Sequence, residues 1–324
     1  MPTYSVSRGF AYNYIHIAPR DSSKKYVLFL HGWPSIAHEW HHQIDHFHKL
    51  GYGVVAPDLL GSGLTARPLL VKHYLLKDMA GDVVEILDHE NISSTVFAVG
   101  HDWGSHLLGR LAVYHPERLE RICFIAVGYR PPRQKIDIDA VNAMTQQKLG
   151  YSTFGYQIFF TKDENAMEIM NQHKDSVMSL LYADDPTTWK VHLGPPGALQ
   201  KWAEAGSTTP YGSYLTEEDH KARNANISEV LGGLPSLNWY KAHAFNHNYE
   251  AEKGIPDDKT KLTQPTLYLT CQHDYIGVWS LQLAAMEAYV PDLQVQHLNT
   301  GHWGQLQAAE EVNLALENFF SRSS

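Results

Sequence analysis

STVFAVGHDWGSHLLGR, residues 94–110, has the pattern of a strand, a tight turn and a helix. An apolar run over 96–99 predicts a buried strand, glycines at positions 100 and 104 flank a turn, and residues 105–115 have helical periodicity. A sharp turn between a strand and a helix exposes the residue at its apex. Here that residue is Asp102, so the turn is expected to present a carboxylate.

The same strand-and-turn design recurs along the chain and alternates with helical stretches. Short apolar runs predict further strand-and-turn segments at 26–32, 54–63, 122–127, 265–274 and 293–304. Helical spacing predicts helices at 74–90, 105–115, 280–290 and 309–320. Strands that alternate with helices form a mostly parallel sheet with helices on both faces. The sequence therefore predicts the α/β class.

The alternation stops near Arg130 and resumes near residue 259. The block 131–258 is richer in Gln, Asn, Tyr, Trp, Gly and Pro, and it has helical segments without a clear buried strand. We expect this block to be an α-helical cap inserted into one sheet domain, which consists of 1–130 and 259–324. The polar, partly alternating residues before the first buried strand are compatible with a hairpin.

Composition and charge narrow the classes of function. The 324 residues are 44% apolar and 19% charged, which is typical of a globular protein. The formal net charge of −9 disfavours nucleic acid or anionic lipid as a partner. No apolar run reaches the length of a membrane span, and the first residues lack a signal-peptide pattern. We expect a cytoplasmic protein with a small-molecule substrate. A homodimer is compatible with the sequence.

The sequence has no strong signature of a metal or cofactor. Cys123 and Cys271 lie in apolar strand-like runs and form no C-x-x-C pair. His38, His42 and His46 recur at i, i+4 and i+8, which would put them on one helix face at a spacing that can bind zinc. No carboxylate with an open coordination position accompanies them. The segment at 59–68 lacks a nucleotide-binding glycine pattern. We predict no metal and no cofactor.

Three polar residues that follow predicted strands have the identities of a catalytic triad. Asp102 follows the strand at 96–99, Asp274 ends the run at 265–274, and His302 comes after the last predicted strand. The carboxyl ends of parallel strands meet at one edge of the sheet, where ligands bind. The chain order nucleophile, acid, histidine is that of the α/β-hydrolases. The sequence therefore predicts an α/β-hydrolase fold with this triad.

An aspartate in the place of a serine changes the available chemistry. A carboxylate can attack saturated carbon and become an alkyl ester, and an unperturbed aspartate with a pKa of ~3.9 is already ionised at neutral pH. Water must then attack the carbonyl of that ester, with His302 as the base and Asp274 as its orienting partner. Trp33 and Trp103 occupy the positions whose backbone N–H groups form the oxyanion hole. Pro34 predicts a cis peptide bond after Trp33.

The motifs together resemble the epoxide hydrolase branch of the α/β-hydrolase family. The resemblance extends from about Arg8 to Phe320. The segments that carry it are HGWPSIAHEWHHQI (31–44), APDLLGSG (56–63), GHDWGS (100–105), HD (273–274) and GHWGQLQAAEEVN (301–313). This resemblance implies an enzyme that converts an epoxide and water into a vicinal diol through an ester on Asp102.

Two further segments look like those that carry the tyrosine pair of this branch. They are FGYQIFF (154–160) and LNWYKA (237–242). The resemblance implies that Tyr156 and Tyr240 hydrogen-bond the epoxide oxygen and donate a proton as the ring opens. A neutral phenol, with a pKa of ~10, can donate to the far more basic alkoxide. The stretches 128–137 and 183–199 match no chemistry that we can place, and we expect them to shape the substrate pocket.

Other functions use parts of the same pattern. A haloalkane or haloacid dehalogenase would use the same aspartyl ester, but it would need cap donors for halide and has no use for a proton. A ligand-binding module on a hydrolase scaffold would need none of the triad. In that case Asp102 would only cap the following helix. The triad and the oxyanion loop occur together, which favours the enzyme.

Overall fold

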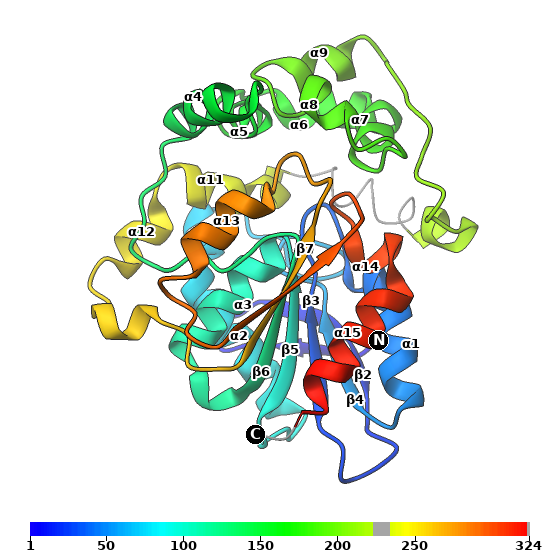
Figure 1. The fold of residues 1–324 in the computed structure, drawn as a ribbon, viewed down its shortest axis with the longest axis vertical. Helices are drawn as coiled ribbons and strands as arrows, with labels where there is room; N and C mark the ends of the chain where they lie inside the picture. Colours follow the sequence, from blue (N-terminus) through cyan, green and yellow to red (C-terminus); the bar gives the residue numbers. More distant parts are fainter. Residues whose placement is uncertain (223–233, 323–324) are drawn as a thin grey trace.

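One eight-stranded sheet runs through the computed structural model, which describes residues 1–222 and 234–322 (Figure 1). The strand order is β1-β2-β4-β3-β5-β6-β7-β8. The strands are β1 (Thr3–Ser5), β2 (Ala11–Ile17), β3 (Tyr26–Leu30), β4 (Gly53–Pro57), β5 (Val96–His101), β6 (Leu119–Ile125), β7 (Thr266–Cys271) and β8 (Leu293–Leu298). Strand β2 pairs antiparallel with β1 and β4, and the other neighbours are parallel. The predicted mostly parallel sheet and N-terminal hairpin are confirmed.

Both faces of the parallel strands are buried under helices. Side chains of β3 alternate between two apolar clusters: Leu28 and Leu30 belong to the cluster that includes helices α2 (Leu76–His89) and α3 (Trp103–Tyr114). Val27 and Phe29 belong to the cluster that includes α1 (His41–Lys49) and α15 (Ala309–Phe320). A strand that is covered on both sides is apolar at every position, which explains the continuous apolar runs in the sequence.

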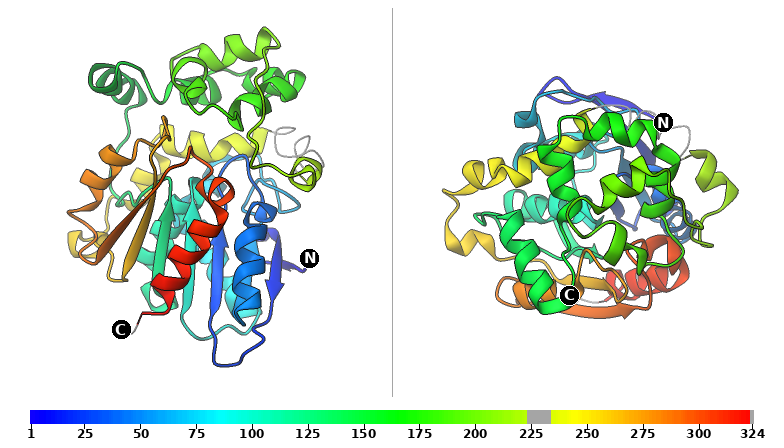
Figure 2. Two further views of the ribbon diagram at one scale, coloured as in Figure 1. Left: turned by 45° about the vertical axis from the view of Figure 1, so that its right-hand side comes forward. Right: turned by 90° about the horizontal axis from the view of Figure 1, so that it is seen from above.

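The chain between β6 and β7 consists mainly of helices that lie beyond the carboxyl edge of the sheet (Figures 1 and 2). Within its described residues, its only β-pairing is an isolated bridge between Ala183 and Tyr211. The helices are α4 (Ile138–Leu149), α5 (Gly155–Lys162), α6 (Ala166–Gln172), α7 (Lys174–Leu181), α8 (Thr188–His192), α9 (Ala198–Glu204), α11 (Asn238–Ala244) and α12 (His247–Glu252). Helices α4 to α9 form an upper layer, and α11 and α12 lie closer to the sheet.

The remaining helices are short or complete the sheet domain. They are α13 (Trp279–Met286), α14 (Gly304–Gln307), η1 (Ala37–Trp40), η2 (Val71–Tyr74), η3 (Pro116–Arg118), η4 (Leu234–Leu237) and η5 (Asp257–Thr260). Helix α3 begins directly after Asp102, two residues earlier than predicted, because the turn before it is tighter than the sequence pattern indicates. Helix α13 ends at Met286, four residues before the predicted end.

Cys123 and Cys271 are free and buried in β6 and β7, as predicted. The peptide bond between Trp33 and Pro34 is cis, also as predicted. None of the described helices combines the length and the apolar composition that are needed to cross a bilayer.

A buried ion pair joins α3 to α12. Arg110 donates from Nε and Nη2 to the two carboxylate oxygens of Glu252, at 2.8 and 3.0 Å. We expect Arg110→Met to lower the free energy of unfolding by about 3–5 kcal/mol, because the buried Glu252 carboxylate would lose its partner. The double variant with Glu252→Met should lose much less, since no charge remains. Chemical denaturation compares the two, and equal losses would contradict the prediction.

Candidate active site

The turn after β5 holds Asp102 in an uncommon backbone conformation. Its φ is 52° and its ψ is −118°, and helix α3 begins at the next residue. The turn packs tightly against the end of β3, because a Cβ at Gly104 would lie 2.0 Å from the backbone oxygen of Leu30. Only glycine fits there. The sharp turn predicted from the sequence therefore exists, and strain at such a position is typical of functional sites.

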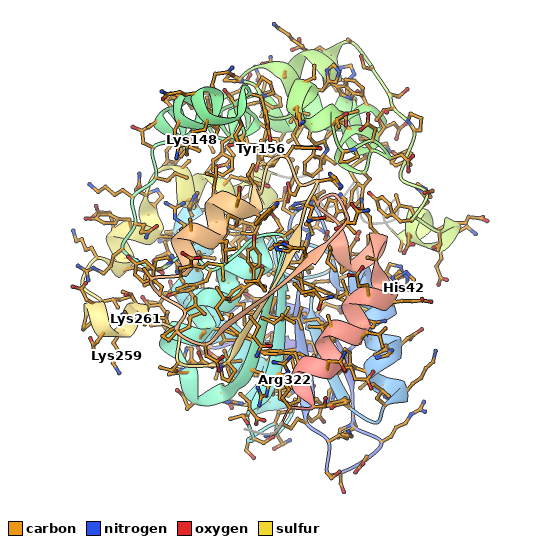
Figure 3. All side chains as sticks on the ribbon, viewed as in Figure 1. His42, Lys148, Tyr156, Lys259, Lys261 and Arg322 are labelled. Atoms are coloured by element: carbon orange, nitrogen blue, oxygen red, sulfur yellow. The ribbon has the colours of Figure 1, made fainter. Side chains whose placement is uncertain are left out.

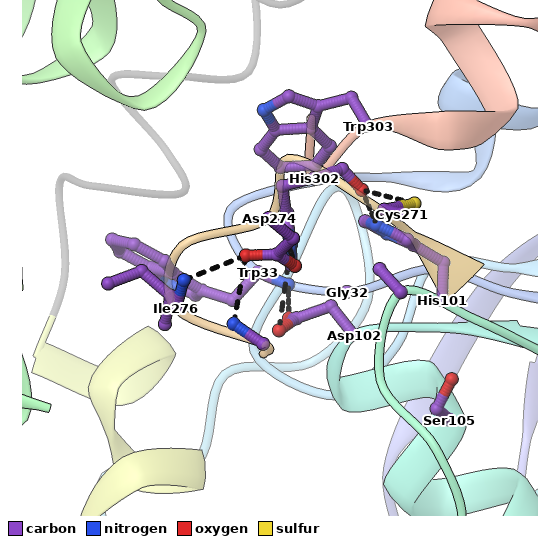
Figure 4. A network of polar contacts seen from close by, with 12 residues as sticks. Gly32, Trp33, His101, Asp102, Ser105, Cys271, Asp274, Ile276, His302 and Trp303 are labelled. Atoms are coloured by element: carbon purple, nitrogen blue, oxygen red, sulfur yellow. Dashed lines mark hydrogen bonds and ion pairs between the residues drawn. The ribbon is translucent and has the colours of Figure 1, made fainter. Parts of the chain in front are cut away.

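Asp274 and His302 meet Asp102 at the carboxyl edge of the sheet (Figure 4). His302 Nδ1 lies 2.6 Å from Asp274 Oδ2, and His302 Nε2 lies 3.8 Å from Asp102 Oδ2. Because an ionised carboxylate only accepts hydrogen bonds, Nδ1 carries a proton toward Asp274, and Nε2 faces Asp102. The other Asp274 oxygen accepts backbone N–H groups of Ile276 and Gly277, at 2.9 and 2.8 Å. These contacts fix the imidazole in one orientation.

The electrostatics differ between the two ionisable groups that face each other. Burial disfavours the charged form of His302, but the Asp274 carboxylate, its hydrogen bond and the Asp102 carboxylate outweigh burial and raise the pKa of His302 above 6.5. Burial raises the pKa of Asp102 above 3.8, and His302 and the backbone N–H groups of Trp33 and Trp103 oppose that rise. The charge of each of these two groups therefore shifts the pKa of the other.

Backbone N–H groups face the Asp102 carboxylate. The N–H of Trp33 donates to Asp102 Oδ1 at 2.9 Å, and the N–H of Trp103, at the start of α3, also favours the charged carboxylate and so lowers the pKa of Asp102. The loop after β3 comes so close that a Cβ at Gly32 would lie 2.5 Å from this same oxygen. The two donors are the ones that the sequence predicted for an oxyanion hole.

Two phenols and the carboxylate line one cavity of about 300 Å³. Tyr156 comes from α5 and Tyr240 from α11, and their ring centroids lie 5.9 Å apart. Figure 3 labels Tyr156 on the side of the upper helices that faces the sheet. Burial and the Asp102 charge raise the pKa of Tyr156, and burial and Tyr156 raise that of Tyr240, so both phenols stay protonated at neutral pH. The structure thus brings all the predicted site residues together.

Three side chains that the sequence analysis did not single out support this site. His101 Nε2 donates to the backbone oxygen of His302 at 2.9 Å. His31 Nε2 accepts the N–H of Leu59 at 2.9 Å and so joins two loops at the sheet edge. Gln157 donates to the Tyr156 hydroxyl oxygen at 3.2 Å. The two histidines directly precede Gly32 and Asp102 in the predicted motifs, and this position in the sequence could have identified them as supporting residues.

The two stretches expected to shape the pocket behave differently. Residues 128–131 and Gln134 line the cavity, as expected of the first stretch. Among the described residues, none from 183–199 lines it, so the expectation is wrong for the second stretch. Its Trp189 ring instead packs against the His302 ring, with centroids 5.2 Å apart. That stretch covers the histidine rather than the substrate space.

The predicted histidine face also differs in the structure. His38 lies in η1, before α1 begins, and His46 in α1 pairs with Glu317 at 3.0 Å, so His38, His42 and His46 do not form one helical stripe. His38 and His41 lie instead 3.3 and 3.5 Å from Asp219 Oδ1. This trio is the one group in the described residues whose ligand atoms are close enough to hold a metal ion. It contributes no residue to the cavity lining.

Comparison with known proteins agrees with this geometry. Residues 25–309 match the family model described as the alpha/beta hydrolase fold. The chain is 25% identical over 329 residues to the Neurospora crassa protein "Epoxide hydrolase srdG". The alignment covers 98% of this chain and 93% of that protein. It is 26% identical to epoxide hydrolase B of Mycobacterium tuberculosis over 349 residues, or 96% of each chain.

A solved structure extends the likeness to three dimensions. The crystal structure of epoxide hydrolase VrEH1 from Vigna radiata superposes with a TM-score of 0.77, at 26% identity, over 98% of this chain and 97% of that one. The predicted fold class is confirmed. The chain is therefore a hydrolase that belongs to the α/β-hydrolase fold family, and the epoxide hydrolases among its relatives resemble it over nearly its whole length.

Proposed function

We propose that this protein opens an epoxide with water to give a vicinal diol, through an alkyl ester on Asp102. The observation that carries the proposal is the shared cavity, which is lined by two neutral phenols, the Asp102 carboxylate and the His302 imidazole. A halide leaving group needs no proton, whereas an epoxide oxygen does. The phenols therefore favour an epoxide over a haloalkane or haloacid.

The two oxygens of Asp102 take different roles. Oδ2 attacks an epoxide carbon, the carbon–oxygen bond of the ring breaks, and Tyr156 or Tyr240 gives a proton to the departing oxygen. Oδ1 already accepts the Trp33 N–H at 2.9 Å, so it becomes the carbonyl oxygen of the ester. The same donors then stabilise the oxyanion that forms when water attacks the Asp102 carbonyl carbon.

Ester formation also prepares the base for the second step. His302 Nε2 is 3.8 Å from Asp102 Oδ2, which is too long for a hydrogen bond, so Nε2 can contact a water molecule instead. Esterification removes the Asp102 charge, which is one cause of the raised pKa of His302. The imidazole thus becomes more readily neutral when it has to accept a proton from water. The Cγ–Oδ2 bond then breaks, and the departing diol oxygen takes the proton that His302 removed from water. Asp102 is left as a carboxylic acid, and the loss of its proton restores both the carboxylate and, through solvent, the phenol.

The cap is part of this proposal. We treat 131–258 as one insert in a core of 1–130 and 259–324. In support, β6 and β7 are parallel neighbours in the sheet although the whole block separates them in sequence. The insert supplies both phenols, and the core supplies the carboxylates and the imidazole.

A turnover panel tests the function. The purified protein is incubated with aryl, terminal aliphatic and fatty-acid epoxides, with haloalkanes and with fluoroacetate, while diol and halide are measured side by side. We expect diol from at least one epoxide class and no halide. Halide release without diol would replace the proposal by a dehalogenase. Binding without turnover of any compound would favour a ligand-binding module.

The charge coupling predicts a measurable pKa difference. Asp102→Asn removes the negative charge and keeps the shape, so the pKa of His302 should be lower in this variant than in the wild type, as it would be in the ester. Ester hydrolysis needs neutral His302 and should therefore rise with pH to a plateau. Ester formation needs ionised Asp102 and should fall as pH falls through its raised pKa.

NMR titration of the His302 ring measures the first effect, with exposed His273 as the internal control. Single-turnover kinetics at a series of pH values separates the two steps. An unchanged pKa of His302 in Asp102→Asn would show that the Asp102 charge does not raise the pKa of the base.

A further inference from the structure

One end of the catalytic cavity carries a positive charge. Arg130 lines the cavity together with His106 and His243, and its Nη1 lies 3.1 Å from His243 Nε2. Burial and the neighbouring Arg110 lower the pKa of Arg130 to about 10, so the guanidinium is still charged at neutral pH. A half-buried cation in a mostly apolar cavity needs an explanation, because desolvating a charge without a partner is costly.

No described carboxylate pairs directly with this cation, and Glu252, which pairs with Arg110, acts on it only as a nearby charge. Arg110 beside it has a bidentate partner in Glu252, and no described acidic side chain forms an ion pair with Arg130. Its hydrogen bonds to described residues go to His243 and to the backbone oxygen of Lys135, at 3.1 and 3.2 Å. A guanidinium has five N–H donors, so most of its donor capacity is unused.

The neighbouring histidines do not change this balance. Burial and nearby arginines lower the pKa of His106 to about 3 and hold that of His243 well below 6.5. Both rings are therefore neutral at pH 7. A hydrogen bond to the backbone also holds Arg130 in place, because Arg110 Nη1 donates to the backbone oxygen of Arg130 at 2.5 Å. The cavity end thus holds one positive charge in a defined place.

Helix α11 connects this charge to the reacting groups. Tyr240 and His243 are three residues apart on that helix, which puts them on one face with a rise of about 4.5 Å between them. The Trp103 ring contacts both, with centroids 5.0 and 5.6 Å away. Arg130 therefore contacts a side chain on the face of α11 that also carries Tyr240, and it lines the same cavity as Tyr240 and Asp102.

We propose that Arg130 binds a carboxylate of the substrate, and that the substrate class is a short epoxy acid that spans this cavity with its carboxylate at Arg130 and its epoxide at Asp102. This inference rests on the proposed function. A guanidinium matches a carboxylate with two parallel hydrogen bonds and holds it in one orientation. Binding the acid at Arg130 would then place the epoxide beside Asp102 and Tyr240.

The test compares an acid with its neutral counterpart. For 5,6-epoxyhexanoate and its methyl ester, diol formation gives kcat/KM for each, and the same is done for the long-chain pair from 10,11-epoxyundecanoate. Wild-type enzyme should prefer the short acid over its ester by about 10- to 100-fold, the range of a charged hydrogen-bonding pair. The long pair should show a smaller preference, because its carboxylate lies too far from the ring.

Arg130→Gln should bring the short-chain preference to about one, mainly through KM of the acid. Lys135→Gln is the matched control, because it removes the same charge from an exposed side chain that does not line the cavity, and it should keep the preference. The diol acid, 5,6-dihydroxyhexanoate, should also raise the thermal unfolding midpoint of the wild type and not of Arg130→Gln.

Several outcomes would overturn the inference. A wild-type preference near one, or equal losses of the preference in Arg130→Gln and Lys135→Gln, would mean that Arg130 does not bind the substrate carboxylate. A lower unfolding midpoint in Arg130→Gln with an unchanged preference would make its role structural. In each of these cases diol formation from the esters would leave the epoxide hydrolase proposal intact. Absence of diol from every epoxide would reject that proposal itself.

Discussion

His302→Gln is expected to bind an epoxide, form the ester on Asp102 and stop there. Ester formation needs the Asp102 carboxylate and the phenols, whereas hydrolysis needs a base that takes a proton from water. Glutamine keeps a polar side chain of similar length but accepts no proton at neutral pH. Turnover should therefore fall by about 10²–10⁴-fold, the usual contribution of a general base. Intact-mass analysis should show one substrate mass added to the protein.

Peptide mapping should place that added mass on Asp102. Two variants make the comparison specific: Asp102→Ala should give no adduct, and His273→Gln should turn over normally without accumulating one. His273 is a matched control because it directly precedes Asp274 but is exposed and hydrogen-bonds Asn299. Neither its ring nor its backbone contributes to the cavity lining.

Isotope labelling gives an independent readout of the same mechanism. A single wild-type turnover in ¹⁸O-water should put the label into Asp102, because water attacks the ester carbonyl and Oδ2 leaves with the diol. If the label appears only in the diol and His302→Gln stays unmodified by an active substrate, water attacks the epoxide directly. The covalent route would then be wrong, although the enzyme could still hydrolyse epoxides.

The double variant Tyr156→Phe with Tyr240→Phe is expected to lose nearly all epoxide opening. Each phenol faces the cavity that holds Asp102, and each loses only a hydroxyl in the substitution, so packing is kept. Without a proton donor the ring oxygen must leave as an alkoxide. The loss of a positioned acid typically costs 10²–10⁴-fold, and each single variant should lose part of that. Stopped-flow measurement of ester formation follows the affected step directly.

Tyr151→Phe provides the control for this pair. Tyr151 belongs to the same cap segment and packs against Tyr275, but it does not line the cavity. Its variant should form the ester at the wild-type rate. Wild-type rates in the double variant would mean that another group activates the oxygen. Slower ester hydrolysis with normal ester formation would assign the phenols to the second step.

The sequence contained the local information that sets the core of the site. A buried strand, a turn that admits only glycine at position 104 and a following helix can present Asp102 in just one way, so the elbow was predictable from local patterns. Asp274 and His302 were predictable because parallel strands bring their carboxyl ends to one edge. The tyrosine pair depended on the resemblance of two segments, since 18 tyrosines offer no local criterion.

Only the tertiary structure determined what surrounds these residues. Whether a charge is paired depends on neighbours that are distant in sequence: Glu252 neutralises Arg110 across 142 positions, while Arg130, nearer in the chain, lacks a described carboxylate partner. The histidines at 38, 42 and 46 look like one stripe in the sequence, but a 3-10 turn before α1 redirects His38 toward Asp219. Strand and turn patterns are local, so the sequence alone determined the fold and the triad. Whether a charge is paired and buried depends on residues that are distant in sequence, so only the folded chain determined which charges and polar groups line the cavity.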